Sequence, residues 1–195
     1  MTAVPKSVTP SKSPRSSASA KKSAARSASS SLASAPTSED RSANRRADAP
    51  MIAVMDTTLR DGEQTPNVSY TPAEKLQLAR MLLVDVDVDR IEIASTRVSS
   101  GELESAELIT KWARKSRLIQ RVEMLGYCDG KKSVDWICGA GGKVMNLLTK
   151  GSERHCLEQL GLTPEQHRER VSSTVRYARK KRLTVNVYLE DWSSG

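Results

Sequence analysis

The 195-residue sequence has few of the features that mark a secreted or membrane-bound protein. It contains three cysteines, two histidines and only 4% aromatic residues. Cys128, Cys138 and Cys156 are odd in number and form no CxxC pair, which fits a reduced, intracellular protein with inert thiols. No apolar run approaches the roughly 20 residues of a membrane span, and no signal-peptide pattern opens the chain. We therefore expect a cytoplasmic protein with no membrane partner.

The first 50 residues lack aromatic side chains and almost lack large aliphatic ones. They consist largely of Ser and Ala, so they cannot bury enough apolar surface to offset the entropy of ordering the chain. Nine Lys and Arg stand against three acids in this stretch, which therefore holds +6 of the net charge of +8. We predict a disordered basic tail over residues 1–50.

Three roles remain open for this tail. It is a plain solvated extension, a transit peptide that directs the protein to a plastid or mitochondrion, or a weak nucleic-acid binder. The nucleic-acid role is the least favoured, because no aromatic residue is interleaved with the charges for base stacking.

From about residue 51, five short β-branched runs alternate with helical patterns. The runs cover residues 52–55, 90–94, 122–125, 144–148 and 184–189. This alternation predicts an α/β fold with parallel strands and right-handed crossovers. The runs are nearly continuous and apolar, as expected for strands that helices cover. In the last run we expect Val185 and Val187 to face inward.

Capping signals mark where the helices begin. Thr71-Pro72-Ala73-Glu74 and Thr163-Pro164-Glu165-Gln166 combine a capping box with proline at the first helical position. Ser99 and Glu102 form a further box, and residues 133–140 form a shorter helix that Gly141-Gly142 ends.

Such a sheet forms either an open doubly wound fold or a barrel. No GxGxxG follows the first run, so a dinucleotide-binding fold loses its main support. A complete barrel needs about 250 residues. We predict that residues 51–195 are the N-terminal part of a TIM (β/α)8 barrel, preceded by the tail, and that the chain stops before the barrel closes.

Residues 56–64 read Asp-Thr-Thr-Leu-Arg-Asp-Gly-Glu-Gln and follow the first strand. In a barrel the active site lies at the carboxyl ends of the strands. There the Asp61 carboxylate can hold a hard divalent cation, and the Arg60 guanidinium can stabilise a developing oxyanion. The competing interpretation is an Arg–Asp ion pair that closes a turn.

This block resembles the signature of the condensing enzymes that use acetyl-CoA and a 2-oxo acid, namely the 2-isopropylmalate, citramalate and homocitrate synthases. The resemblance continues through residues 91–95, 146–151 and 187–192 and covers essentially all of residues 51–195. It implies a metal-dependent Claisen condensation in branched-chain amino-acid biosynthesis, with acetyl-CoA as co-substrate and Mg²⁺, Mn²⁺ or Zn²⁺ as the metal. A homodimer is implied for the full-length protein.

The resemblance also assigns residues. Asp61 matches the family's metal-ligand aspartate, and Arg60 matches its charge-stabilising arginine. Glu190 matches a glutamate that orients the substrate or takes part in proton transfer.

Three large residues at strand ends bear on the choice of substrate. Leu125, Leu148 and Tyr188 are expected to face the 2-oxo acid together with Arg60 and Glu190, although core packing is the competing role for the leucines. Large residues here resemble the pattern that takes pyruvate to citramalate. Smaller ones would leave room for 2-oxoisovalerate and hence 2-isopropylmalate.

One departure from the family is the absence of its His-x-His metal ligands. His155 and His167 lie in polar helical stretches, and we expect both at the surface. The metal site is then half present, and we expect the 195-residue chain alone to be inactive. The alternatives are a non-catalytic fragment and a barrel resembling the 3-hydroxy-3-methylglutaryl-CoA lyases.

Overall fold

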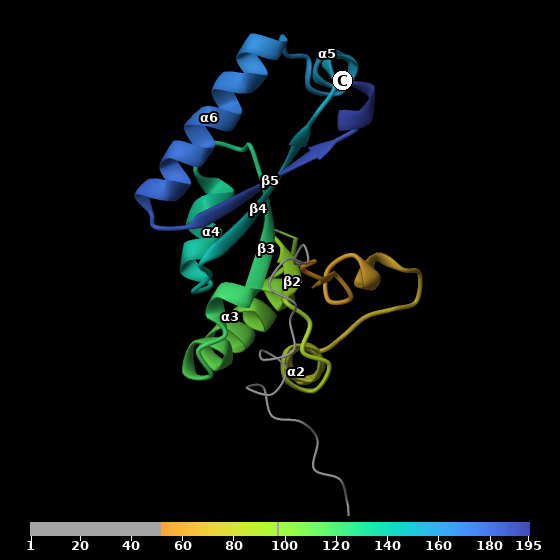
Figure 1. The fold of residues 1–195 in the computed structure, drawn as a ribbon, viewed down its shortest axis with the longest axis vertical. Coiled ribbons are helices and arrows are strands. Elements are labelled where there is room, and N and C mark those ends of the chain that lie inside the picture. The colour runs from red at the N-terminus through yellow and green to blue at the C-terminus, as the bar shows by residue number, and fades with distance from the viewer. Residues whose placement is uncertain (1–51, 97) are drawn as a thin grey trace, which may run out of the picture. The chain divides into compact units, whose positions relative to one another are not determined.

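The computed structural model describes residues 52–96 and 98–195, and the predicted tail at residues 1–50 lies outside them. The described residues form a parallel sheet whose strands follow in chain order, β1-β2-β3-β4-β5 (Figure 1). The strands are Met55–Asp56 (β1), Arg90–Ser95 (β2), Val122–Tyr127 (β3), Val144–Lys150 (β4) and Thr184–Glu190 (β5). A doubly wound sheet reverses its strand order at one point, whereas this order continues without reversal. The prediction of an α/β fold and the early part of a TIM barrel is confirmed.

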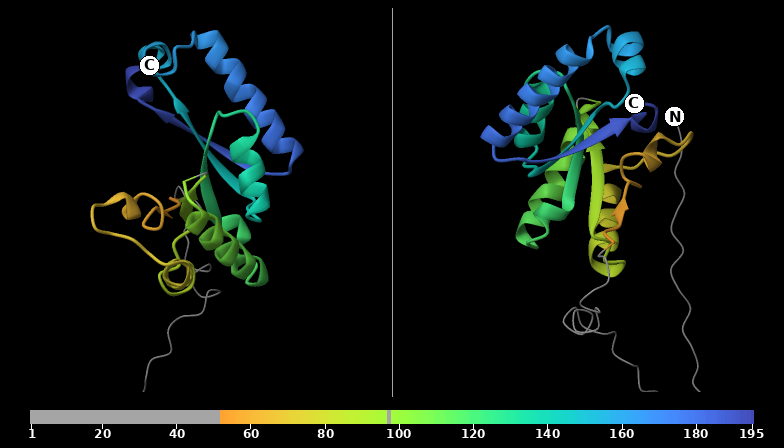
Figure 2. Two further views of the ribbon diagram at one scale, coloured as in Figure 1. Left: turned by 180° about the vertical axis from the view of Figure 1, so that it is seen from behind. Right: turned by 45° about the horizontal axis from the view of Figure 1, so that its top comes forward.

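Helices connect the strands and share one side of the sheet, because right-handed crossovers that advance in one direction repeat on the same face. The α-helices are Pro72–Arg80 (α2), Ser100–Lys115 (α3), Lys132–Gly139 (α4), Glu153–Leu160 (α5) and Pro164–Lys180 (α6). Figure 2 shows α4 and α6 together on the outside of β4 and β5. A π-helical turn at Met81–Asp85 prolongs α2, and short 3-10 turns lie at Gly62–Gln64, Ile119–Arg121 and Trp192–Ser194.

The predicted helix starts are confirmed at atomic detail. The Thr71 hydroxyl accepts the Glu74 amide N–H, and the Glu74 carboxylate accepts the Thr71 amide N–H at 2.7 Å. The box at Thr163 has the same reciprocal bonds. Ser99 caps α3 by accepting the Glu102 N–H, but the box predicted there is only half formed, because the Glu102 carboxylate contacts Lys75 instead. These bonds satisfy amides that the first helical turn leaves without a partner.

The first strand differs from its prediction at residues 52–55. It pairs with β2 only at Met55 and Asp56, so it begins three residues later and ends one residue later than expected. Ile52 is 85% exposed and Val54 is half-exposed, since in the described part of the chain β1 has a single neighbour. The apolar run at residues 52–55 thus predicted the approximate position of β1 but not which residues pair with β2.

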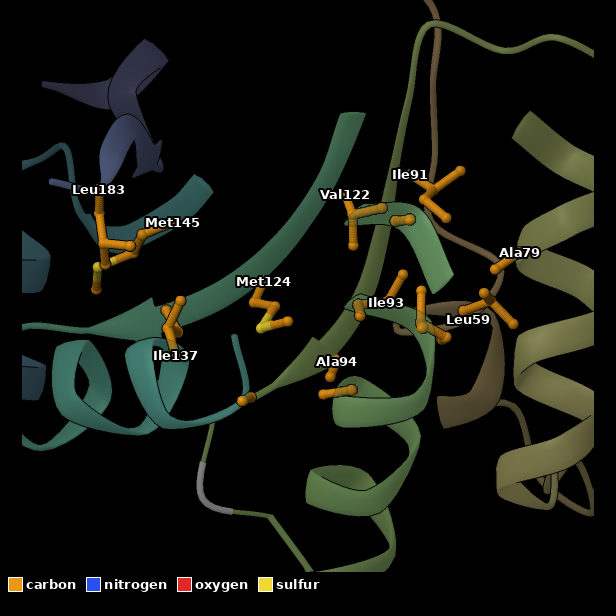
Figure 3. Packing of buried hydrophobic residues seen from close by; sticks show 14 of the residues in the cluster. Leu59, Ala79, Ile91, Ile93, Ala94, Val122, Met124, Ile137, Met145 and Leu183 are labelled. Atoms are coloured by element: carbon orange, nitrogen blue, oxygen red, sulfur yellow. The ribbon is translucent and has the colours of Figure 1, made fainter. Parts of the chain in front are cut away.

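The two faces of the sheet differ in chemistry. The side chains that face the helices are apolar, and Figure 3 shows their core. Its strand residues are Ile91, Ile93, Val122, Met124, Met145 and Leu147.

Val185 and Val187 pair in register with Met145 and Leu147 and therefore lie on the helix side. The expectation that they face inward is wrong, because the intervening Asn186 and Tyr188 take the inner positions. Val187 remains 44% exposed on the helix side. Among the described residues no helix combines the length and the apolar character needed to cross a membrane.

Candidate active site on the inner face

The sheet curls until its first and last strands meet across one face. The Tyr188 hydroxyl of β5 lies 3.3 Å from the Met55 sulfur of β1, although 133 residues separate them in sequence. We call this side the inner face and define it by Met55, Glu92, Glu123, Asn146 and Tyr188. Side chains of opposite strands fill the interior of a barrel in the same way.

The loop after β1 turns sharply and aims Arg60 at the inner face. The Thr57 carbonyl accepts the backbone N–H groups of Arg60, Asp61 and Gly62 at 2.8–3.1 Å. Thr58 bonds back to the Asp56 carboxylate through its N–H at 2.9 Å and its hydroxyl at 3.0 Å. The Leu59 side chain is fully buried and anchors the turn in the core.

Arg60 is held between two carboxylates of different exposure. Its Nε donates to Glu92 Oε2 at 2.5 Å, and its Nη1 donates to Asp61 Oδ1 at 2.8 Å. Glu92 is completely buried, whereas the Asp61 side chain is 59% exposed. The Arg60–Asp61 ion pair considered from the sequence exists, but the buried Glu92 is the partner that fixes the guanidinium.

Beyond Glu92 the inner face carries a chain of polar contacts that the sequence analysis missed. Asn146 Nδ2 donates to Glu92 Oε1 at 2.6 Å, and Asn186 Nδ2 donates to Asn146 Oδ1 at 2.9 Å. Asn186 Nδ2 also lies 3.3 Å from Glu123 Oε2, and Glu123 pairs with Arg90 at 3.2 Å. Polar residues in the middle of apolar strands were the available signal for these contacts.

Tyr188 lies above this polar layer and is partly buried. Burial first, and then the negative charges of Glu92 and Glu123, raise the pKa of Tyr188 to about 12. The phenol therefore stays protonated at neutral pH and can donate a hydrogen bond.

The ends of β4 and β5 are fastened together around Glu190. Its carboxylate accepts from Lys150 Nζ at 2.5 Å, and its carbonyl accepts the Gly151 N–H at 2.7 Å. A Cβ at Gly151 would come within 2.7 Å of the Trp192 Cα, so only glycine fits. The partly exposed Glu190 carboxylate is thus held at the carboxyl edge of the sheet.

Three of the predicted site residues, Arg60, Leu148 and Glu190, line two separate hollows, whereas Asp61 and Tyr188 line neither of them. One hollow, of about 300 Å³, is lined by Arg60, Glu63, Ser95 and Glu102 among others. The other, of about 220 Å³, is mainly apolar and is lined by Leu148 and Glu190, with Tyr127, Leu162 and His167. Leu125 is almost fully buried and lines neither of these two hollows.

A buried lysine supports the first hollow. Lys75 of α2 is 1% exposed, and its Nζ contacts both Glu63 Oε2, at 2.5 Å, and the Glu102 carboxylate. Burial raises the pKa of both carboxyls. At Glu63 the hydrogen bonds from Lys75 and from the Tyr70 N–H together outweigh burial, so the pKa of Glu63 is lowered. Burial outweighs Lys75 at Glu102 and raises the pKa of that carboxyl. The one sequence signal for the burial of Lys75 was its position four residues before Ala79, since residues one helical turn apart lie on the same face of a helix.

The histidines are not where the sequence analysis expected them. His167 is 8% exposed, and its Nε2 lies 2.9 Å from Thr149 Oγ1 and 3.1 Å from the Lys150 carbonyl oxygen. The prediction of a surface residue is wrong for His167, because α6 packs this side chain against the end of β4. His155 is partly buried and lies 3.5 Å from the Asp191 carboxylate.

The side chains of the described residues offer only part of a metal site. Within residues 52–96 and 98–195 no three His, Cys, Asp or Glu side chains are grouped closely enough to hold an ion. Asp61 is an exposed carboxylate that fits one position of an oxygen-ligand set. The described residues do not complete such a set.

Comparison with known proteins shows the family of the chain. The family model described as HMGL-like matches residues 51–194. The chain belongs to the HMGL-like family. Its relatives include the (R)-citramalate synthase of Methanocaldococcus jannaschii, 35% identical over 141 residues, or 72% of this chain and 28% of the relative. The homocitrate synthase of Methanopyrus kandleri is 36% identical over 72% of this chain and 34% of its own length. The 2-isopropylmalate synthase of Saccharolobus solfataricus is 31% identical over 72% and 35%.

Among solved structures, the HMG-CoA lyase of Brucella melitensis matches with a TM-score of 0.50 at 20% identity. The match covers 72% of this chain and 49% of the lyase and supports the HMGL-like fold alone. The chain thus spans about a quarter to a third of the length of the curated synthases it matches.

Proposed function

We propose that this chain is the N-terminal part of the catalytic barrel of an acyltransferase that condenses acetyl-CoA with a 2-oxo acid. Pyruvate is the favoured 2-oxo acid and citramalate the favoured product, in branched-chain amino-acid biosynthesis. The same chemistry on 2-oxoisovalerate would give 2-isopropylmalate. Membership of the HMGL-like family and the names of the synthase relatives support the proposal.

The observation that carries the proposal is the position of Arg60. Its guanidinium lies at the carboxyl end of β1, fixed from one side by the buried Glu92. Condensation builds negative charge first on the enolate oxygen of acetyl-CoA and then on the former keto oxygen. A cation fixed in advance stabilises such charge without having to reorganise during the reaction. Arg60 would take this role and would also orient the carboxylate of the 2-oxo acid.

Residues at the other end of the face would bind and orient the substrate. Leu148 presents an apolar wall beside Glu190. Leu125 is almost fully buried and pairs in register with Asn146 of the inner face, where it would limit the room for the substrate. Glu190, held by Lys150, would orient the substrate or accept a proton. Tyr188 would donate a hydrogen bond, since its raised pKa keeps the phenol protonated.

A divalent metal, Mg²⁺, Mn²⁺ or Zn²⁺, is part of the proposal, with Asp61 as one ligand. When bound, such an ion would polarise the keto group of the substrate. A complete ligand set would need residues beyond those described, so we propose that the 195-residue chain alone does not turn over. The proposal includes a homodimer for the longer protein.

The second candidate is cleavage of 3-hydroxy-3-methylglutaryl-CoA, the reaction named for the structural neighbours. The lyase of Brucella melitensis is 20% identical to this chain, whereas the synthase relatives are 31–36% identical. The synthase proposal is therefore the better supported of the two.

The test joins this chain to the C-terminal part of the M. jannaschii citramalate synthase and measures release of free CoA from acetyl-CoA. We expect release that depends on pyruvate and on a divalent metal, with slower release for 2-oxoisovalerate. The chain alone, as the control, should release none. Cleavage of HMG-CoA by the joined protein, without condensation of either 2-oxo acid, would support the lyase instead.

A further inference from the structure

The polar contacts on the inner face form one continuous path from β3, through β5, β4 and β2, to the loop after β1. The path runs from Glu123 through Asn186 and Asn146 to Glu92 and ends at Arg60. Glu92 and Asn146 are 0% exposed and Glu123 is 1% exposed. Buried polar atoms are costly unless each has its partner, so the members of this path depend on one another.

The charges along the path balance. Arg60 pairs with Glu92 at one end, and Arg90 pairs with Glu123 at the other. Two neutral amides, Asn146 and Asn186, connect the two ion pairs. The two amides add no charge to the path, but their donor and acceptor ends set the orientation of each hydrogen bond along it.

Asn146 determines which way the Glu92 carboxylate faces. The terminal torsion of a glutamate has a broad, roughly two-fold preference, so a single hydrogen bond does not fix its plane. In Glu92, Oε2 accepts from Arg60 while Oε1 accepts from Asn146 Nδ2 at 2.6 Å. Donors on both oxygens hold the carboxylate in one orientation, and the Arg60 guanidinium follows it.

Asn186 determines which way the Asn146 amide faces. An isolated amide can turn over and exchange its donor and acceptor ends. Asn186 Nδ2 donates to Asn146 Oδ1 at 2.9 Å, so the Asn146 oxygen faces β5 and its Nδ2 faces Glu92. Asn186 therefore acts on Arg60 one hydrogen bond further away than Asn146 does, through Asn146 and Glu92.

We propose that Asn146 is a positioning residue that orients Glu92 and, through Glu92, the guanidinium of Arg60. Asn146 does not reach the substrate in this account. Its importance for condensation rests on the proposed function, whereas its effect on Arg60 does not.

The experiment uses the side-chain Nε–Hε resonance of Arg60 in the full chain, assigned by comparison with Arg60→Lys. In the unaltered protein this proton should lie far downfield and exchange slowly with solvent, because it points at a buried carboxylate. Asn146→Leu should move the resonance upfield and speed its exchange about tenfold, the change expected when a hydrogen bond to a charged group is weakened. Asn146→Ala, which removes the donor without adding bulk or charge, should do the same if the leucine variant does not fold.

Two further variants separate positioning from general loosening of the strand. Asn186→Leu should shift the Arg60 resonance in the same direction by a smaller amount. Thr149→Val removes a buried hydroxyl from β4 on the helix side, where it contacts His167, and should leave Arg60 unchanged. An unchanged Arg60 resonance in both Asn146 variants, or an equal shift in Thr149→Val, would overturn the inference.

A titration with pyruvate, made on the chain joined to the C-terminal part of the M. jannaschii synthase, separates this inference from the proposed function. Pyruvate should move the Arg60 resonance in the unaltered protein and bind more weakly to Asn146→Leu. A chain whose Arg60 ignores pyruvate but responds to the Asn146 variants would count against the proposed function while supporting Asn146 as the residue that positions Arg60.

Discussion

The two faces of one sheet are built by different rules, although their residues alternate along the same strands. On the helix side, Ile93 and Leu147 are fully buried among apolar neighbours. One residue away on the inner face, Glu92 bonds to Arg60 and Leu148 lines a hollow. Apolar branched side chains usually dominate the interior of such barrels, yet here charges and amides occupy it. Burial of apolar side chains accounts for the residues on the helix side. On the inner face, hydrogen bonds and ion pairs hold charged side chains in fixed positions.

The largest effect we expect comes from two neighbouring leucines of β4. Leu147→Ala should lower the free energy of unfolding by about 2–5 kcal/mol, because it leaves a cavity in the core, and should not change substrate preference. Leu148→Ala should cost less stability and should instead favour 2-oxoisovalerate over pyruvate by about 10–200-fold, the range for a small change in pocket volume.

Urea denaturation measures the first effect. CoA release with each 2-oxo acid, by the chain joined to the C-terminal part of the M. jannaschii synthase, measures the second. Equal changes of preference in both variants would show that the faces are not separate in function.

A smaller effect is expected from Glu63 and Glu102, the two partly buried carboxylates that contact Lys75 at the first hollow. Removing a hydrogen bond to a charged group costs about 1.5–3 kcal/mol, and Glu63→Gln should cost this much at pH 7. Glu63 has a lowered pKa, so its contribution is present above the unfolded value of 4.5 and is lost as the pH falls through the folded value. Glu102 has a raised pKa, so the folded state holds its proton more tightly than the unfolded state does, and folding stability falls as the pH rises through the folded pKa. Glu102→Gln should therefore cost less free energy of unfolding at pH 7 than Glu63→Gln.

Denaturation of both glutamine variants at pH 7 and at about pH 3 checks the sign. The difference in free energy of unfolding between Glu63→Gln and Glu102→Gln should be smaller at the lower pH, because both carboxyls take up protons there. A gap that widens on acidification would reverse the assignment of the two pKa shifts.

The smallest effect is expected at the edge of the inner face. Lys150→Met removes the partner of Glu190, whose side chain is 48% exposed. Exposed ion pairs contribute about 0–1 kcal/mol, so the free energy of unfolding should fall by less than about 1 kcal/mol. A loss above about 2 kcal/mol in urea denaturation would mean that this edge is part of the structural core.

The sequence predicted the parts of the fold that depend on local patterns. The capping boxes at Thr71 and Thr163 and the alternation of strands and helices needed no tertiary information. The pairing of β1 and the inward expectation for Val185 and Val187 failed, because pairing and facing depend on the register with neighbouring strands.

The site was only partly predictable for the same reason. The position of Arg60 and Asp61 after the first strand followed from the motif. Glu92 and Asn146 lie 54 residues apart in sequence, and only the closed-up sheet brings them together. His167 was misplaced because its polar surroundings in sequence do not reveal the packing of α6 on β4.

The central claim is that Arg60 acts on substrate rather than merely closing a buried ion pair, and one matched comparison tests it. Arg60→Gln and Arg90→Gln each remove an arginine from a buried glutamate of the inner face, Arg60 at the carboxyl end of β1 and Arg90 at the start of β2. In the chain joined to the C-terminal part of the M. jannaschii synthase, we predict that Arg60→Gln lowers pyruvate-dependent CoA release at least about 10²-fold. Arg90→Gln should lose comparable stability but keep its rate within about tenfold. Equal losses of rate in the two variants, or full activity without Arg60, would contradict the account.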